Sequence, residues 1–425
     1  MYLDWVSFSR CPTIFNGSTT NPQTKTTMHK DEGDENFQKL QKLLHLAVKL
    51  ELFTIPFYLY TYYSLTNRNS HVGMHLREVI MEEMLHMAMV SNIMHALDGC
   101  EHPAYSPVKE RAKCTPELAK KYVPFYPGYA PIYIPENEKK EKDDIRCIPK
   151  KAKPLHLDSL SIDQIVTFLR LELPELTEVS SSPESRLAKG WQTIGEFYDY
   201  VKIQFLSCSN LEFIPLEQIE LYTHNPTKER NTMKPVRNLK DALDNIDFIV
   251  EQGEGATFYN LAKHDEKYQH QMDHKDTLVE TEIKNTELAH FYHFLLIYYE
   301  MGGKEPFTIE TKKFDEEKFR QKFDGEKYRR FREANVINLV KDPAEALKNG
   351  RYPQAAVEAN MLFNSNYSRM LDKLTYASVD DHRLNFGIAL EHMTKFDELA
   401  DEVKKFKLNR SKTTYCGPTF EYLCP

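Results

Sequence analysis

The chain has 425 residues, of which 41% are hydrophobic and 28% charged, and its formal net charge is −8. This is the balance of an ordinary globular protein, and its mild acidity without a long Lys/Arg block argues against nucleic acid as the main partner. The N-terminal residues lack the basic and apolar regions of a signal peptide, and the most apolar stretch is interrupted by Lys49, Glu51 and Pro56. Neither a leader nor a membrane span is therefore predicted.

The cysteines are scattered, odd in number and without a CxxC pair. They are Cys11, Cys100, Cys114, Cys147, Cys208, Cys416 and Cys424. This pattern predicts neither a zinc knuckle nor a disulfide framework, and reduced thiols in the cytoplasm are the expectation.

The first part of the chain predicts two helices after a polar arm. Residues 1–36 are rich in Thr, Asn and Asp and form this N-terminal arm. From Phe37 to about Leu65 apolar residues recur at helical spacing, with a kink expected at Pro56. A second helix is expected over about 74–97, before Asp98-Gly99.

The remaining elements are also helical. Residues 100–160 are rich in Pro and Tyr and predict a long crossover, after which Ser161 caps a short helix that stops before Pro174. Further helices are expected at about 185–206, 238–255, 277–301, 361–378 and 382–406. Residues 302–350 are expected to form an excursion on the surface. Strand signals are weak throughout, so the predicted fold class is all-α.

Two Glu-x-x-His motifs carry the chemistry of the sequence. Glu83 and His86 lie in the second helix, and Glu287 and His290 repeat their spacing in the helix expected at 277–301. Residues three apart share one face of a helix. One such motif is common by chance, whereas two copies in apolar helices indicate a metal site.

A dimetal carboxylate bundle needs one further Glu from each of two other helices. Glu51 in the first helix and Glu196 in "TIGEFYDYV" supply them. The six residues on four helices, with a long crossover between the second and third, predict a ferritin-like four-helix bundle with added peripheral helices. Carboxylates with imidazoles suit two iron ions, with manganese as the alternative, and leave positions for dioxygen or substrate.

Plainer roles remain open for several of these residues. Glu51 and Glu196 could instead be helix-terminal carboxylates or ion-pair partners of Lys49 or Lys202. His293, Tyr58 and Tyr62 are candidates for positioning substrate or passing protons, and the alternative for each is a place in the core. Glu251 and Glu254 could line the site or order the residues around it.

Seven segments of the chain carry a family resemblance. They are "LELFTIPFYLYTYYSL", "REVIMEEMLHMAMVSNIMHALDG", "SIDQIVTFLRLELPE", "TIGEFYDYV", "IVEQGEG", "ELAHFYHF" and "GPTFEY". Together they resemble the ferritin-like domain of the iminophenyl-pyruvate dimer synthases, which serve bisindole pathways of the violacein and rebeccamycin type. Segments 1–36, 105–155 and 302–350 match no motif of that family.

The resemblance implies a function. Its enzymes couple two imines derived from an aromatic amino acid, so we expect a diiron oxidoreductase that uses dioxygen and a small imino acid-type substrate. The alternatives are an iron-binding, ferroxidase-like protein and a scaffold that keeps the bundle for protein interaction. A homodimer is allowed. The expected organisation is an arm at 1–36, a dimetal bundle at 37–301 and a helical extension at 302–425 packed on it.

Overall fold

A computed structural model describes most of the chain from Glu32 to Cys424. The described residues are 32–108, 113–133, 153–173, 191, 193–214, 218–219, 233, 235–255, 289–304, 315–377, 382–411 and 413–424. All structural statements below concern these residues.

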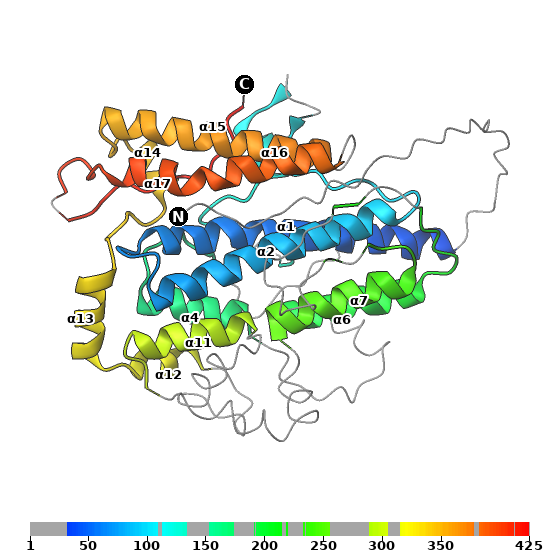
Figure 1. The fold of residues 1–425 in the computed structure, drawn as a ribbon, viewed down its shortest axis with the longest axis horizontal. Coiled ribbons are helices and arrows are strands. Elements are labelled where there is room, and N and C mark those ends of the chain that lie inside the picture. Colours follow the sequence, from blue (N-terminus) through cyan, green and yellow to red (C-terminus); the bar gives the residue numbers. More distant parts are fainter. Residues whose placement is uncertain are drawn as a thin grey trace.

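Two long helices form the spine of the molecule (Figure 1). They are α1 (Glu32–Tyr63) and α2 (His71–Ala96), which pack along each other. Ser70 caps α2 by accepting a hydrogen bond from the backbone N–H of Gly73 at 3.2 Å. The first helix begins five residues earlier than Phe37, inside the predicted polar arm, and residues 1–31 of that arm lie outside the described part. Pro56 lies within α1, which continues past it.

Four shorter helices complete the bundle in two pairs. α4 (Ile162–Leu171) packs on α11 (His290–Glu300), and α6 (Ile194–Ser207) packs on α7 (Leu239–Val250). The first pair lies along one half of the α1–α2 spine and the second pair along the other half (Figure 1). Two of the four bundle positions are thus each filled by two shorter helices, and ends of these helices meet near the middle of the spine.

The caps explain where these helices begin. The Ser161 side chain accepts a hydrogen bond from the Gln164 N–H, as predicted, and Thr193 and Asn238 cap α6 and α7 in the same way. The helix expected at 238–255 ends as a single π-helical turn, η3 (Glu251–Gly255). The helices expected from residues 185 and 277 are described only from Ile194 and His290 onwards.

A set of outer helices covers the bundle. They are α3 (Pro116–Ala119), α12 (Glu316–Gln321), α13 (Gly325–Asn335), α14 (Pro343–Lys348), α15 (Gln354–Ala377), α16 (His382–Thr394) and α17 (Phe396–Lys404). α12 contacts α4, and α17 contacts α1. The prediction of one helix over 382–406 is wrong, because the structure has two. Thr394 donates its hydroxyl to the Glu391 carbonyl at 2.8 Å at the break, a local bond that competes with helix continuation.

The all-α prediction is confirmed for the described part of the chain. Its regular structure is helical, and β-pairing is limited to isolated bridges such as Gly128 with Leu155. One helix, over Glu35–Tyr63, is long and apolar enough to cross a membrane by length and composition. In the fold, 83% of its most apolar window is buried, which is the burial of a core helix.

The expectation that all cysteines are reduced is wrong for one pair. Cys114 and Cys424 form a disulfide with their Cα atoms 5.4 Å apart, within the range such bonds require. The two residues are 310 positions apart, so sequence spacing gives no sign of the pairing. The bond ties the crossover to the C-terminal tail. Cys100, Cys208 and Cys416 are free thiols.

Candidate metal centre

Five ionisable side chains converge in the interior where the shorter helices meet the spine. They are Glu51 from α1, Glu83 and His86 from α2, Glu172 at the end of α4 and His290 at the start of α11. Each is at most 1% exposed. Burying so many charged or polar groups is costly unless they pair or bind an ion.

The five side chains form two groups that share one carboxylate. Glu51, Glu83 and His86 form one group, and Glu83, Glu172 and His290 form the other, with the potential ligand atoms of each group within 4.8 Å of one another. His86 Nδ1 lies 3.7 Å from Glu51 Oε2. His290 Nδ1 lies 3.3 Å from Glu83 Oε1 and 3.5 Å from Glu172 Oε2. Each group offers one imidazole, one carboxylate of its own and the shared carboxylate of Glu83.

Two tyrosines hold the unshared carboxylates in the same way. The Tyr198 hydroxyl of α6 donates to Glu51 Oε1, and the Tyr58 hydroxyl of α1 donates to Glu172 Oε1. The second oxygen of each carboxylate, Oε2, faces a histidine. The tyrosines therefore fix which oxygen of Glu51 and Glu172 is turned toward the centre.

The donor set fits a pair of metal ions. In the described structure, both oxygens of Glu83, both ring nitrogens of His86 and of His290, and Glu172 Oε2 are buried and make no hydrogen bond. A buried polar atom left without a partner costs about 1–3 kcal/mol, so a cluster of seven would be strongly destabilising if nothing bound it. Metal coordination satisfies such atoms, and carboxylates mixed with imidazoles suit iron or manganese.

The electrostatics of the two histidines differ. Burial alone lowers the pKa of His290, but the carboxylates of Glu172, Glu82 and Glu83 raise this pKa well above its ordinary value. For His86, burial and the nearby His290 lower the pKa to about 3. Burial would raise the pKa of Glu83, and the adjacent His290 lowers it. A divalent cation binding here would compete with the proton that His290 retains.

A fourth carboxylate, that of Glu82, stands at the edge of the centre. Glu82 Oε2 lies 3.3 Å from His290 Nε2, on the opposite side of the ring from Glu83 and Glu172, and the Glu82 side chain is 14% exposed. It is the more exposed neighbour of the buried Glu83, although the oxygen that faces His290 is itself buried.

The π-helical turn η3 covers the two histidines, whose rings are stacked with centroids 5.4 Å apart. A Cβ atom added to Gly253 would lie 3.0 Å from His86 Cε1 and 3.6 Å from His290 Cε1. A side chain at this position would be tight against the His86 ring and in ordinary contact with the His290 ring, so glycine favours the close approach of the backbone to His86. The segment "EQGEG" thus packs closely against the two histidine rings through Gly253. Glu251 is exposed, and the Glu254 side chain lies outside the described part.

The other candidate residues that the structure describes belong to neither of the two groups. Glu196 lies in the first turn of α6, where its N–H bonds the Thr193 hydroxyl, and it belongs to neither group. His293 contacts His75 instead, and Tyr62 packs against Tyr63 and Arg68. Glu287 lies outside the described residues.

Glu172 is the member of the centre that the sequence reasoning missed. It follows the last residue of α4 as its C-cap, so it is not the mid-helix ligand that a ferritin-like pattern leads one to seek. A signal was present, because Glu172 stands between Leu171 and Leu173 at the end of an apolar helix. A carboxylate flanked by apolar residues on both sides is a candidate for a functional buried charge.

A match to a family model agrees with this architecture. A family model described as Ferritin-like matches residues 44–299, more than half of the chain. Among solved structures, the chain is similar to a ferritin-like protein from Caulobacter vibrioides, with 18% identity and a TM-score of 0.47, over 91% of this chain and 98% of that one. No curated protein matches. The family match contains all five residues of the centre, from Glu51 to His290, and more than half of the chain, so the chain belongs to the Ferritin-like family.

Proposed function

We propose that the chain is a dinuclear non-haem iron oxidoreductase that uses dioxygen to oxidise a small aromatic or amino-acid-derived substrate, such as an imino acid. The observation that carries the proposal is the pair of buried ligand groups sharing Glu83. A carboxylate shared between two imidazole–carboxylate pairs supplies three of the four carboxylates and both imidazoles of a dimetal bundle, and Glu287, which precedes His290 by three residues, lies outside the described part. Manganese in place of one or both irons is compatible with the same donors.

The roles of the residues follow from their positions. Glu51 with His86 would hold one ion, Glu172 with His290 the other, and Glu83 both. The bound irons would supply the electrons and open positions needed to reduce dioxygen. Tyr58 and Tyr198 orient the unshared carboxylates, and each hydroxyl carries a proton at the edge of the centre. The burial of all five side chains excludes bulk water.

An aromatic cluster beside Glu172 supports the proposed substrate class. The rings of Tyr58, Phe168 and Phe294 lie 4.7–5.1 Å apart, and Tyr58 also bonds Glu172. All three rings are fully buried, and we propose that they would form the apolar side of a site for a small aromatic molecule whose polar end faces the centre. In the proposed coupling, two imino acids form one new bond and lose two electrons and two protons, which dioxygen accepts as hydrogen peroxide.

Product analysis tests this proposal directly. Imino acids would be made in place from an aromatic amino acid by an amino-acid oxidase, with catalase present, and the iron-loaded protein added. We expect a coupled or oxidised product by mass spectrometry with the wild type and none with Glu83→Ala. If neither protein changes the imino acid, the oxidoreductase proposal fails.

An iron-oxidising protein without an organic substrate is the second candidate. It is favoured by the near-complete burial of the five side chains, which leaves the centre more accessible to ions and dioxygen than to a large molecule. Oxygen uptake driven by ferrous iron alone, with no product from the imino acid, would select this function. A cytoplasmic location stays a prediction, and the Cys114–Cys424 disulfide counts against it, because such bonds persist mainly in oxidising compartments.

A further inference from the structure

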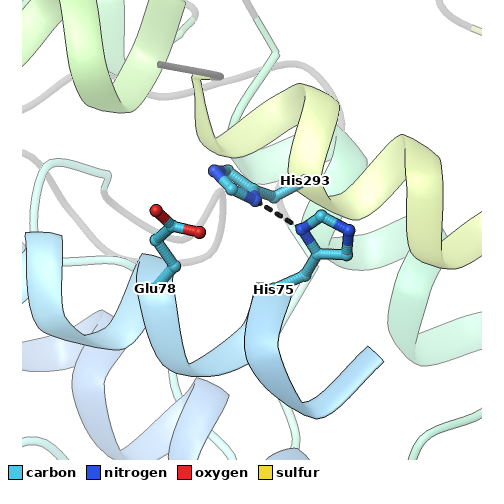
Figure 2. Close-up of side chains that lie close together, drawn as sticks. All are labelled: His75, Glu78 and His293. Atoms are coloured by element: carbon cyan, nitrogen blue, oxygen red, sulfur yellow. Dashed lines mark hydrogen bonds between the residues drawn. The ribbon is translucent and has the colours of Figure 1, made fainter. Parts of the chain in front are cut away.

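A second cluster of metal-ligating side chains lies outside the centre, between α2 and α11. His75 and Glu78 come from α2 and His293 from α11, and the potential ligand atoms of the three lie within 4.8 Å of one another. Figure 2 shows the two imidazoles facing each other, with the Glu78 carboxylate turned toward the same space. His75 and Glu78 are three residues apart and so share one face of α2.

The distances suit a single ion. His75 Nδ1 and His293 Nδ1 are 2.8 Å apart. Two nitrogens bound at about 2.0–2.1 Å to one metal, at right angles, would be about 3 Å apart, so the rings need to separate by only a few tenths of an ångström. The two histidines are 3% and 4% exposed, whereas Glu78 is exposed, so the cluster opens to solvent on the carboxylate side.

The residue types select the class of ion. Two imidazoles and one carboxylate, with remaining positions open, form the donor set of mononuclear iron(II) sites and of catalytic zinc sites. Magnesium and calcium prefer oxygen ligands and are disfavoured by the two nitrogens. We propose that His75, Glu78 and His293 bind one divalent transition-metal ion of the zinc, cobalt and iron(II) class, separate from the dinuclear centre.

A neighbouring histidine–carboxylate pair supports the site. The His71 ring packs edge-on against the His75 ring with centroids 4.4 Å apart, and His71 Nδ1 lies 2.8 Å from Glu300 Oε2. Groups of this kind around a metal ligand fix the orientation of its ring. The His71 ring thus restricts the His75 ring by packing against it.

The site is independent of the dinuclear centre in its ligands. Glu78 precedes Glu83 by five residues, which is a rise of about 7.5 Å along α2, and none of the three residues belongs to the central groups. His293 follows His290 by one helical turn. The two sites can thus be disabled one at a time.

Cobalt binding tests the site. Equilibrium dialysis of the full-length protein against Co²⁺, followed by metal analysis, should give one ion fewer per chain for Glu78→Gln and for His293→Gln than for the wild type. Glu78 is exposed, so Glu78→Gln should fold normally, and circular dichroism would verify this for both variants. The matched control is His95→Gln, which removes one member of another histidine pair, His95 of α2 with His102 of the segment that follows α2, whose Nδ1 atoms are 3.2 Å apart. Among the described residues no carboxylate completes a three-ligand group there, so the control should bind as much cobalt as the wild type.

The same assay separates this site from the centre. In a Glu83→Ala background, the ion that remains should disappear when Glu78→Gln is added. Unchanged cobalt binding in both Glu78→Gln and His293→Gln would overturn the inference and leave a plain hydrogen bond between two histidines. Cobalt that depends on Glu78 but not on Glu83 would support this site while contradicting the dinuclear centre.

Discussion

Tyr58 and Tyr198 are the residues that turn a set of carboxylates into an ordered centre. Each occupies one oxygen of a glutamate and leaves the other facing a histidine. Hydrogen bonds of this kind to metal ligands are worth 10- to 100-fold in metal affinity in other proteins. The geometry of the centre thus depends on two hydroxyl groups that do not themselves face the histidines.

Removal of either hydroxyl should weaken metal binding. For Tyr58→Phe and Tyr198→Phe we expect ferrous iron to bind roughly 10- to 100-fold more weakly, because Glu172 or Glu51 is then free to rotate. Anaerobic titration with a competing chelator would measure this. Tyr63→Phe is the matched control, since Tyr63 is also a buried tyrosine of α1 and its hydroxyl makes no hydrogen bond in the described structure. Equal affinities in all three variants would show that the hydroxyls do not position the ligands.

At the residue scale, sequence spacing located four of the five members of the centre. Glu83 with His86 and His290 were found through Glu-x-x-His motifs, and Glu51 through its place in an apolar helix. Glu172 was not found, because it lies at a helix end and the pattern points to mid-helix residues. Periodicity reports which face of a helix is buried, but it does not report which helix ends meet in space.

At the scale of elements, the centre lies where helices end. Glu172 caps α4, His290 begins α11 and Gly253 belongs to the turn after α7. A continuous four-helix bundle would present only mid-helix side chains there. Because two bundle positions are interrupted, the C-terminus of α4, the N-terminus of α11 and the backbone of Gly253 all reach the two ligand groups. Helical periodicity alone does not predict where a helix of the bundle is interrupted.

The outer helix α12 is joined to α4 by a small ion-pair network. Glu316 Oε1 lies 3.5 Å from Arg170 Nη1, and Glu316 Oε2 lies 3.0 Å from Arg320 Nη1. Arg320 Nε lies 2.8 Å from Asp163 Oδ1. Burial alone would raise the pKa of Glu316, but Arg170 and its other cationic neighbours lower it. A carboxyl group with a lowered pKa in the folded state stabilises the fold above its ordinary pKa of about 4.3, and this contribution is lost as the pH falls through the lowered value.

Glu316→Gln should therefore destabilise the protein at neutral pH and not in acid. We expect a loss of at most about 1 kcal/mol in the free energy of unfolding at pH 7, because the pair is partly exposed to solvent. Urea denaturation at neutral and acidic pH would measure the difference, which should shrink toward zero as the pH falls. The control is Glu317→Gln, the exposed neighbour on the same helix. A difference that persists unchanged in acid would mean that the charge of Glu316 is not what holds α12.

At the scale of the whole molecule, the disulfide joins two distant parts of the chain. Cys114 lies in the crossover and Cys424 near the end of the tail. Tyr422 of this tail also bonds Asp372 of α15 at 2.7 Å. The disulfide thus links the crossover to the C-terminal tail on the outside of the bundle. It also restricts the unfolded chain, because it closes a long loop.

Loss of the disulfide should lower the stability of the protein. For Cys424→Ser we expect a loss of roughly 2–5 kcal/mol in the free energy of unfolding, the usual range for removal of a native disulfide. Thermal or urea denaturation with and without reductant would measure it, and reduction should lower the stability of the wild type but not of the variant. Cys208→Ser, which removes a free and partly buried thiol, is the control. A wild type insensitive to reductant would show that the bond is absent or contributes no stability.

In the proposed centre one carboxylate, that of Glu83, serves two metal ions. The direct measurement is the iron content per chain after anaerobic loading of wild type and Glu83→Ala with ferrous iron, with folding verified by circular dichroism. We expect Glu83→Ala to bind about two ions fewer than the wild type, because both ligand groups lose their shared member. Equal iron content in the two proteins, or the loss of a single ion, would contradict it.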